Sequence, residues 1–475
     1  MSLAPSPAER SSAIFETPVP ETSPIPSRSP ASDRISHPAP AHPIDILRFN
    51  TCGSVDDGKS TLIGRLLYDS KSLMEDQIEA LERSADITGG GQINLANLTD
   101  GLRAEREQGI TIDVAYRYFA TPRRKFIIAD TPGHVQYTRN MVTGASTANL
   151  SIVLVDARTG VIEQSRRHSC IASLLRIPHL VVAINKMDLV GWSEDRFRQI
   201  RDDFEKFLPR LDIKDVKFIP ISALHGDNVV EPSPHTPWHT GPTLLGHLET
   251  VHIASDWNLQ GFRLPVQWVN RPNNPTDPRL HDFRGFSGQI AGGVVRTGQK
   301  VAVLPAGITT TVKEIRTFSG PVEEAFCPQS VTLLLEHDVD VSRGNMIVGL
   351  DDHLPGAGTD LQAKIAWMHP RPLQRGRKYF LKHTTHTVQA VVTEIENRID
   401  IASLEPQAAP AELALNDIGE IRLRTGKPLF YDGYATNRLT GSFILIEQNT
   451  NATVAAGMLL PPRDTVKPES ADYII

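Results

Sequence analysis

Cysteine is scarce in this 475-residue sequence, and long apolar runs are missing from it. The three cysteines, Cys52, Cys170 and Cys327, are too few and too widely spaced for a disulfide framework or a zinc knot. That usage favours a reducing compartment, in which each thiol is expected to be a small buried hydrophobic group. Because no run reaches about 18 apolar residues, no segment is expected to span a membrane.

Basic residues are outnumbered as well. The sequence has 49 Lys and Arg residues against 55 Asp and Glu residues, and its formal net charge is −6. This acidity, together with the lack of a long basic cluster, argues against a large nucleic-acid-binding surface. A content of 40% hydrophobic and 22% charged residues is that of an ordinary soluble protein, long enough for about three domains.

The first 44 residues differ from the rest because they are rich in Pro, Ser and Ala. This composition predicts a disordered tail over residues 1–44. Proline interrupts the segment before the apolar core of a secretory signal can form. Acidic residues at Glu9, Glu16, Glu21 and Asp33 argue against an organelle transit peptide. We therefore expect a cytoplasmic protein with a dispensable tail.

Two kinds of pattern follow the tail. Over residues 45–256, short apolar strands alternate with helical stretches, which predicts an α/β domain with a mostly parallel sheet and helices on both faces. Over residues 257–356 and 357–475, short β-patterned segments are separated by Gly, Pro and Asn turns, which predicts two all-β barrel domains. In the second of these, His383 and His386 are three residues apart on one expected strand, so they should face opposite sides and share no metal.

The segment GSVDDGKST, which starts at Gly53, matches G-x-x-x-x-G-K-[ST] without gaps. It follows the apolar strand ILRFNTC and precedes a helical apolar pattern, which is the context of a phosphate-binding loop, or P-loop. Glycines let backbone N–H groups turn toward phosphate oxygens, and the helix directs its positive dipole end at them. Lys59 is expected to neutralise the β- and γ-phosphates, and Ser60 to ligate Mg²⁺. A plain Gly-rich turn is the alternative.

A second segment, DTPGH, follows the predicted strand FIIAD at the same expected sheet edge. Asp130 is expected to hold Mg²⁺ through water. Gly133 has no side chain to block a hydrogen bond from its N–H to the γ-phosphate. His134 is expected to position the attacking water, with an ordinary surface histidine as the alternative.

Base recognition is predicted from NKMD, which follows the strand VVAI, and from SAL at the end of a later strand. The Asp188 carboxylate can accept hydrogen bonds from N1–H and from the exocyclic amine of guanine, whereas adenine offers no matching pair of donors. The Ala223 N–H is expected to donate to the guanine O6. These segments favour GTP and argue against a kinase or ATPase that acts on ATP alone.

A long polar insertion, roughly residues 69–104, separates the P-loop helix from Asp130 and leads into EREQGITID. Loops of this length within a compact domain are usually functional. Thr111 is expected to contact Mg²⁺ and the γ-phosphate when GTP is bound, and to release them after hydrolysis. A residue that merely starts a strand is the alternative.

The predicted site therefore combines segments that are far apart in the sequence. The predicted catalytic residues are His134, Thr111 and Lys59, and the predicted Mg²⁺ ligands are Ser60, Thr111 and Asp130. The predicted GTP-binding residues are Gly53, Ser54, Val55, Asp56, Asp57, Gly58, Lys59, Ser60, Thr61, Asp130, Thr131, Pro132, Gly133, His134, Asn185, Lys186, Met187, Asp188, Ser222, Ala223 and Leu224.

These segments, followed by two β domains, resemble a GTPase of the elongation-factor class. A closer similarity is to the CysN family, the GTP-hydrolysing large subunit of bacterial sulfate adenylyltransferase. It is carried by GSVDDGKSTLIGRLLYDSK, DGLRAEREQGITIDVAYRYF, KFIIADTPGHVQYTRNMVTGAS, ARTGVIEQSRRHS and LVVAINKMDLV. The similarity extends over nearly the whole chain, from about residue 46 to residue 462.

The resemblance implies a small catalytic partner subunit, CysD-like, in a heterodimer or a larger assembly. That partner forms adenylyl sulfate and pyrophosphate from ATP and sulfate. GTP hydrolysis on this chain drives the unfavourable step, for the assimilation of sulfate toward cysteine. The implied cofactors are GTP and Mg²⁺, and neither a membrane nor a nucleic acid is expected as a partner.

Two absences and one departure accompany this resemblance. The sequence has no S-G-G-x-D-S loop, so the sulfate chemistry is expected on the partner, and no second P-loop, so a fused adenylyl-sulfate kinase is not expected. Val135 follows DTPGH where many relatives carry an acidic residue, which affects how hydrolysis is activated. The main alternative is a translation factor that binds tRNA and the ribosome, since one scaffold hosts both functions; the net acidity argues against it.

Overall fold

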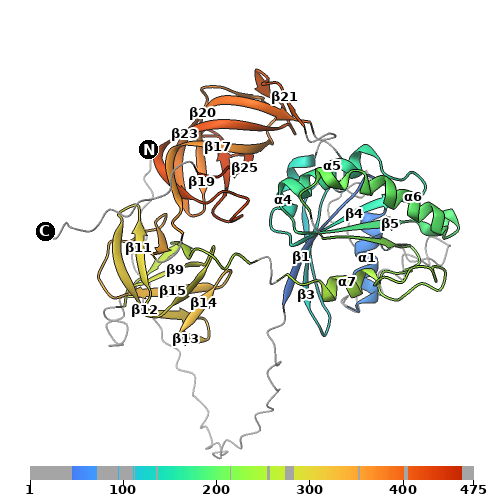
Figure 1. Ribbon diagram of the computed structural model, residues 1–475, viewed down its shortest axis with the longest axis horizontal. Helices are drawn as coiled ribbons and strands as arrows, with labels where there is room; N and C mark the ends of the chain where they lie inside the picture. Colours follow the sequence, from blue (N-terminus) through green and yellow to red (C-terminus); the bar gives the residue numbers. More distant parts are fainter. Residues whose placement is uncertain are drawn as a thin grey trace, which may run out of the picture. The chain divides into compact units, whose positions relative to one another are not determined.

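The computed structural model describes residues 45–71, 95, 111, 113–134, 137–213, 215–253, 257–272, 283–350, 353–400 and 405–462, and the structural statements below refer to these. The predicted tail, most of the insertion before Thr111, and Val135 lie outside the described residues. The described chain comprises one α/β region followed by two β regions (Figure 1).

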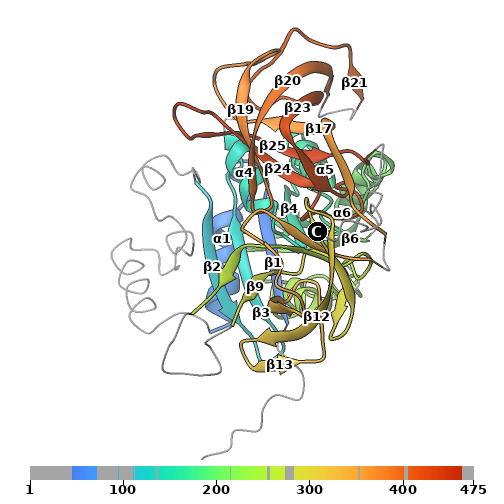
Figure 2. The ribbon, with the colours of Figure 1, turned by 90° about the vertical axis from the view of Figure 1, so that its left-hand side faces the viewer.

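A six-stranded sheet with the order β2-β3-β1-β4-β5-β6 forms the α/β region, and Figure 2 shows β1, β2 and β3 side by side. Its strands are β1 (Ile46–Cys52), β2 (Ala115–Ala120), β3 (Lys125–Asp130), β4 (Leu150–Asp156), β5 (His179–Asn185) and β6 (Asp215–Pro220). Neighbouring strands are parallel except β2 and β3, which are antiparallel. The mostly parallel sheet is thus confirmed, and the carboxyl ends of its five parallel strands meet at one edge.

Helices cover both faces of this sheet because alternate strand residues point to opposite faces (Figure 1). Ile152 and Leu154 of β4 pack with α1 and α7, whereas Val153 and Val155 pack with α4, α5 and α6. The helices are α1 (Lys59–Asp69), α4 (Thr138–Ala145), α5 (Glu163–Leu174), α6 (Glu194–Glu205), α7 (Leu244–Thr250) and the short 3-10 helices η3 (Met187–Val190) and η4 (Leu208–Arg210). Burial of both faces explains why the β4 sequence LSIVLVD is almost continuously apolar.

An eight-stranded antiparallel sheet forms the second region, in the order β7-β16-β11-β12-β15-β9-β8 with β13 paired to β12. Val301 and Val303 of β11 point into its core, as alternation along a strand requires. The strands are β7 (Arg263–Pro265), β8 (Trp268–Asn270), β9 (Gly285–Gln289), β11 (Lys300–Leu304), β12 (Ile308–Thr317), β13 (Gly320–Val322), β15 (Ser330–Leu335) and β16 (Met346–Gly349), with a separate pair of β10 (Val294–Arg296) and β14 (Glu324–Phe326).

The third region is a closed barrel in the order β19-β24-β25-β17-β23-β20, in which β20 pairs back to β19. Closure leaves no free edge in this ring of strands. Two short strands, β18 (Leu373–Gln374) and β22 (Glu412–Leu413), form a separate pair, and β21 (Pro406–Gln407) pairs with β20. The barrel strands are β17 (Gly356–Trp367), β19 (Lys378–His383), β20 (His386–Ile399), β23 (Ile418–Tyr431), β24 (Ser442–Ile446) and β25 (Thr453–Leu459). The predicted boundaries after residues 256 and 356 stay predictions.

The structure corrects the expectation for His383 and His386. The segment KYFLKHTTHTVQAVVTEI is not one strand, because β19 ends at His383 and β20 begins at His386 after a two-residue turn. The two histidines are paired directly across this hairpin, so they share a face instead of facing opposite sides. The chain reverses at Thr384, which has a φ of 48°. β-Branched residues rarely adopt this left-handed conformation, so the sequence did not predict the turn. His383 is buried, and its Nε2 donates to the Thr440 carbonyl at 2.7 Å.

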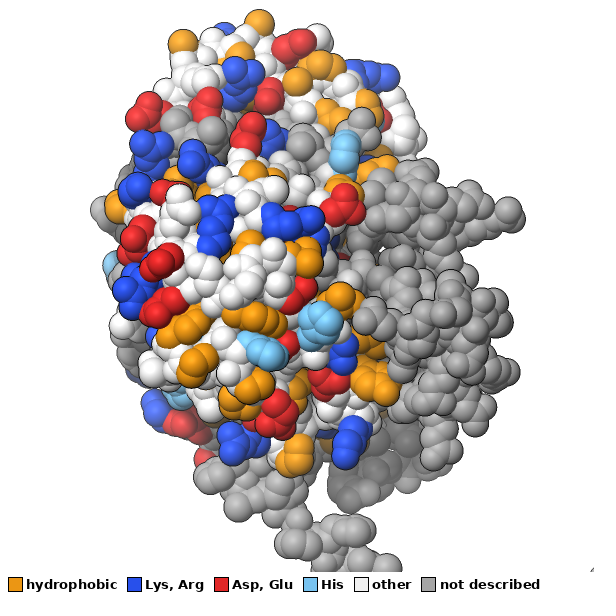
Figure 3. Space-filling model, turned by 90° about the vertical axis from the view of Figure 1, so that its right-hand side faces the viewer, with side chains coloured by type: hydrophobic (Ala, Val, Ile, Leu, Met, Phe, Trp, Pro, Cys, Tyr) orange, Lys and Arg blue, Asp and Glu red, His pale blue; other side chains and the backbone are white. Residues whose placement is uncertain are grey.

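The described surface mixes charges of both signs. On the face shown in Figure 3, acidic and basic side chains are interspersed, and the described basic side chains form no continuous patch there. None of the helices in the described part of the chain combines the length and the apolar character needed to cross a membrane.

Candidate functional site: a phosphate-binding loop at the edge of the sheet

The P-loop joins β1 to α1 at the carboxyl edge of the sheet. Gly58 has a φ of 90°, which glycine adopts readily, and a Cβ there would lie 2.5 Å from Asn185 Nδ2. Lys59 then begins α1, and its Nζ donates to the carbonyls of Gly53 at 3.1 Å and Ser54 at 2.9 Å. The predicted loop therefore curls around its own lysine side chain, which is only 7% exposed.

Burial and neighbouring charges have opposite effects on the pKa of Lys59. Burial lowers the pKa of its ammonium, while the carboxylates of Asp130 and Asp57 raise it. Asp57 is itself 5% exposed, burial raises its pKa, and its Oδ2 accepts a hydrogen bond from the Ser54 N–H. Asp57 thus closes the loop internally, a role that the motif alone does not reveal.

The DTPGH segment lies against the P-loop. A Cβ on Gly133 would lie 2.3 Å from the Gly53 carbonyl oxygen and 2.5 Å from Lys59 Nζ, so only glycine fits there. Asp130 is 2% exposed, and its Oδ1 accepts a hydrogen bond from Thr51 Oγ1 at 3.4 Å. Two predicted segments that are far apart in the sequence are therefore in contact beside the lysine.

His134 and Thr111 are the two remaining residues with predicted catalytic roles. His134 is exposed, and its ring lies 6.1 Å from the Tyr137 ring between centroids. Thr111 is half-buried. The predicted water-positioning and switch roles stay predictions.

Asn185 connects the base-recognition segments to the P-loop. Its Nδ2 donates to the Asp57 carbonyl at 2.7 Å, and its Oδ1 accepts from the Ala223 N–H at 2.9 Å. The Ala223 N–H is predicted to donate to guanine O6, but it already donates to Asn185 Oδ1. The two oxygens would therefore have to share this one donor. Asp188 lies at the start of η3 with its side chain 15% exposed, while the adjacent Met187 side chain is buried in the core.

Two positioning residues escaped the sequence analysis. Arg65 of α1 donates from Nε to the Ala223 carbonyl at 3.3 Å and from Nη2 to the Leu224 carbonyl, and so holds the SAL segment. Gln164 of α5 donates from Nε2 to the Gly133 carbonyl at 2.8 Å. Arg65 and Ala223 are 158 residues apart, and no local pattern signals a contact of that range.

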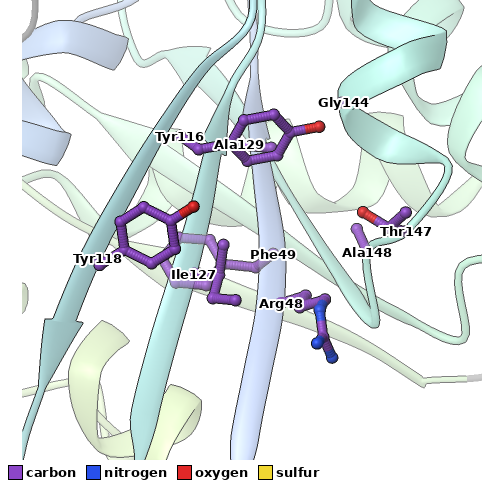
Figure 4. Close-up of a pocket in the computed structure, with 9 residues that line it drawn as sticks. All are labelled: Arg48, Phe49, Tyr116, Tyr118, Ile127, Ala129, Gly144, Thr147 and Ala148. Atoms are coloured by element: carbon purple, nitrogen blue, oxygen red, sulfur yellow. The ribbon is translucent and has the colours of Figure 1, made fainter. Parts of the chain in front are cut away.

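A separate hollow of about 240 Å³ opens on the face of the sheet over β1, β2 and β3 (Figure 4). Tyr116 and Tyr118 of β2 and Arg48 of β1 line it, with Thr147 beyond the end of α4. None of the predicted GTP-binding residues lines this hollow, so it is distinct from the candidate site.

The fold and the site define a GTPase of the elongation-factor class. The family model described as "Elongation factor Tu GTP binding domain" matches residues 44–260, and "GTP-eEF1A C-terminal domain-like" matches residues 360–460. These two matches cover the α/β region and the closed barrel.

Whole-length relatives specify the family further. Sulfate adenylyltransferase subunit 1 of Bacteroides fragilis is 54% identical over 88% of this chain and 86% of its own length, and that of Alteromonas mediterranea is 53% identical over 88% and 87%. The bifunctional enzyme CysN/CysC of Mycobacterium tuberculosis (strain ATCC 25618 / H37Rv) is 56% identical over 87% of this chain and 67% of its own length. The chain belongs to the sulfate adenylyltransferase subunit 1, or CysN, family.

Proposed function

We propose that this chain is the GTP-hydrolysing subunit of a sulfate adenylyltransferase. A partner subunit converts ATP and sulfate into adenylyl sulfate and pyrophosphate, and hydrolysis of GTP to GDP and phosphate on this chain drives that step. The family relationship supports the enzyme, and the relatives' designation as subunit 1 supports a partner. The assembly is a heterodimer or larger, in the cytoplasm.

One observation carries the GTPase part of this proposal. Gly133 and Asn185 each contact the P-loop at the carboxyl edge of the sheet, where open α/β sheets bind ligands. The buried ammonium of Lys59 lies among them and matches a polyphosphate. Asp188 follows Asn185 by three residues, and the guanine base is proposed to bind beside this segment.

The residues present fit Mg²⁺, which prefers oxygen ligands. The Ser60 hydroxyl lies in the first turn of α1, and the Asp130 carboxylate is buried close enough to Lys59 to raise the pKa of its ammonium. With Thr111 they would hold the ion, which neutralises charge on the β- and γ-phosphates when bound.

The chain's own residues supply positioning for hydrolysis. Lys59 and the loop N–H groups hold the phosphates, and the Gly133 N–H meets the γ-phosphate, because no side chain separates it from Lys59. His134 lies three residues after Thr131, whose Oγ1 donates to the Thr51 carbonyl at 2.6 Å, and it orients the water that attacks the γ-phosphorus.

Coupling to the partner follows from linkage. If the γ-phosphate favours one conformation of this chain, and that conformation binds the partner and its intermediates differently, hydrolysis shifts the partner's equilibrium. Gly133 is suited to this because it contacts the P-loop on one side and Gln164 of α5 on the other, so a change at the γ-phosphate reaches α5.

The test is reconstitution of the full chain with the small catalytic subunit from the same organism. Adenylyl sulfate and GDP are measured by chromatography in ATP, sulfate and Mg²⁺, with GTP, with a non-hydrolysable GTP analogue, or without either. Of these three conditions, only the one with GTP should raise the yield of adenylyl sulfate, and GDP should form in proportion. The Lys59→Ala chain should show no such rise, because the phosphates lose their buried cation.

Two outcomes would contradict the proposal. An adenylyl sulfate yield that is the same with GTP and with the analogue would remove the energetic coupling. A chain that does not bind the small subunit but co-sediments with ribosomes or tRNA would favour the translation-factor alternative.

A further inference from the structure

Asp156 ends β4, between the strand that leads into the P-loop and the strand that leads into NKMD. The register pairs Asp156 with Asn185, and the N–H of the following Ala157 donates to the Asn185 carbonyl at 2.8 Å. Its side chain is 5% exposed. A carboxylate that belongs to neither nucleotide motif is therefore buried beside Asn185, at the end of β4.

Two cations share this carboxylate. Arg158 donates to Asp156 from its backbone N at 2.9 Å, from Nε at 3.1 Å and from Nη2 at 2.7 Å, while Lys186 Nζ lies 3.0 Å from Oδ2. Burial raises the pKa of Asp156, but the hydrogen bonds from Arg158 and Lys186 outweigh it and lower the pKa to about 2. The carboxylate is therefore ionised at neutral pH.

Lys186 continues the chain of contacts to the P-loop. Its Nζ also donates to the backbone carbonyl of Asp56, and its backbone is left-handed, with a φ of 63°. Lys186 thus spans from the end of β4 to the P-loop, directly between Asn185 and the base-recognition carboxylate of Asp188. Within the described part of the chain, the Asp156 carboxylate is the counter-charge of this ammonium and the Asp56 carbonyl is its other acceptor.

The loop after Asp156 is held from the other side by α6. Arg196 donates from Nε to the Ala157 carbonyl at 2.7 Å and from Nη2 to the Arg158 carbonyl at 3.0 Å. The loop then turns at Gly160, whose φ is 76°. Because both the backbone and the side chain are fixed, Asp156 is a rigid acceptor for Lys186.

We propose that Asp156 is a positioning residue for guanine nucleotides: it holds the Lys186 ammonium against the P-loop and so fixes the NKMD segment for base recognition. This inference rests on the proposed function. These contacts join Asp156, through Lys186 of NKMD, to the Asp56 carbonyl, and none of them involves Gly133. Asp156 therefore acts on GDP and GTP equally, and its loss weakens both.

The test is Asp156→Asn in the full-length chain, with the dissociation constants of GDP and of a non-hydrolysable GTP analogue measured by calorimetry. Loss of a charge-assisted contact of this kind corresponds to about ten- to hundredfold weaker binding. We expect both nucleotides to weaken by the same factor. In a Lys186→Met background, Asp156→Asn should add little further loss, because the two residues act through one contact.

Two controls separate positioning from general stability. Arg158→Gln removes the other cation but leaves the Lys186 contact, and should change either dissociation constant by less than about threefold. Asp212→Asn, at an exposed ion pair with Arg176 2.9 Å away, should change neither. The urea midpoint of each variant reports any loss of fold. If D156N does not fold, Asp156→Glu carries the same test, because it keeps a carboxylate beside Arg158 but displaces it relative to Lys186, and it should weaken the binding of both nucleotides.

The outcomes distinguish this inference from the proposed function. Unchanged affinity in D156N, a loss confined to one nucleotide, or full additivity with Lys186→Met would each overturn the positioning role, while binding of guanine nucleotides by the parent chain stands. A parent chain that binds neither GDP nor the analogue would instead remove the proposed function.

Discussion

Lys59 is prepared for an anion before any phosphate arrives. Two loop carbonyls accept its hydrogen bonds, and burial lowers the pKa of its ammonium. The two neighbouring carboxylates, Asp130 and Asp57, oppose that effect. A polyphosphate adds negative charge beside a buried cation, where electrostatic attraction is stronger than in water. We therefore expect the preference for phosphate to come from Lys59 and its immediate surroundings.

Base preference is tested by Asp188→Asn. Asn replaces a carboxylate that accepts two hydrogen bonds by an amide that also donates, so GDP should bind about ten- to hundredfold more weakly. Xanthosine diphosphate, which carries a carbonyl in place of the exocyclic amine of guanine, should bind better to the variant than to the parent. Competition binding measures both, with Asp203→Asn on the exposed face of α6 as the control. Unchanged GDP affinity would show that Asp188 does not read the base.

Water positioning is tested by His134→Ala. His134 is exposed and its removal opens no core cavity, so nucleotide binding should stay near the parental value. Single-turnover GTP hydrolysis should fall by about 10²-fold or more, as for a positioned catalytic group. The matched control is His252→Ala, another exposed histidine just beyond α7. Hydrolysis at the parental rate would remove His134 from the mechanism.

Two sets of contacts connect the P-loop to neighbouring elements. The segment after β3 touches the P-loop through Gly133, and α5 holds the same residue through Gln164. The loop after β5 touches the P-loop through Asn185 and Lys186. We therefore expect the first pair of contacts to respond to the phosphates and the second to respond to the base.

Gly133→Ala is the variant that tests the phosphate side. Its methyl group would lie 2.3 Å from the Gly53 carbonyl oxygen, so the segment must move away from the P-loop. Because this segment is proposed to meet the γ-phosphate, a GTP analogue should bind at least about tenfold more weakly while GDP is little affected. Calorimetry measures both constants. Gly358→Ala is the control, since a Cβ there meets only the Asp360 carbonyl oxygen, at 3.8 Å. Equal losses for both nucleotides would contradict the assignment.

The stability of the folded chain depends on burying groups in the correct protonation state. His168 of α5 is 2% exposed, and burial lowers its pKa to about 3. Its pKa is thus depressed on folding from about 6.5. The unfolded chain takes up a proton as the pH falls below about 6.5, whereas the folded chain does not until about pH 3. Stability is therefore full above the unfolded pKa and falls with the pH below it.

His168→Gln should flatten this dependence. In the parent chain, the free energy of unfolding should decrease by up to about 1.4 kcal/mol for each pH unit below about 6.5 through this residue alone. Urea midpoints measured between neutral and mildly acidic pH should therefore converge for the variant and the parent as the pH falls. His252→Gln serves as the exposed control. Parallel pH curves for the His168 variant and the parent would refute the assignment.

Much of the fold could be predicted because its signals are local. Strands buried on both faces, such as β4, are continuous apolar runs, and the P-loop is a contiguous motif with its own strand and helix. The hairpin at His383 and His386 could not be predicted in this way. Its turn residues are threonines that ordinarily continue a strand, and the closure of the barrel decided the reversal.

The sequence by itself determined the nucleotide class and the family, because phosphate and guanine recognition depend on short segments whose order and chemistry can be read directly. Only the tertiary structure decided which other residues complete the site. Arg65, Gln164 and Asp156 act through acceptors and cations on other elements. The physical reason is that a parallel sheet brings the ends of distant strands to one edge, so the partners of these side chains exist only once the sheet has formed.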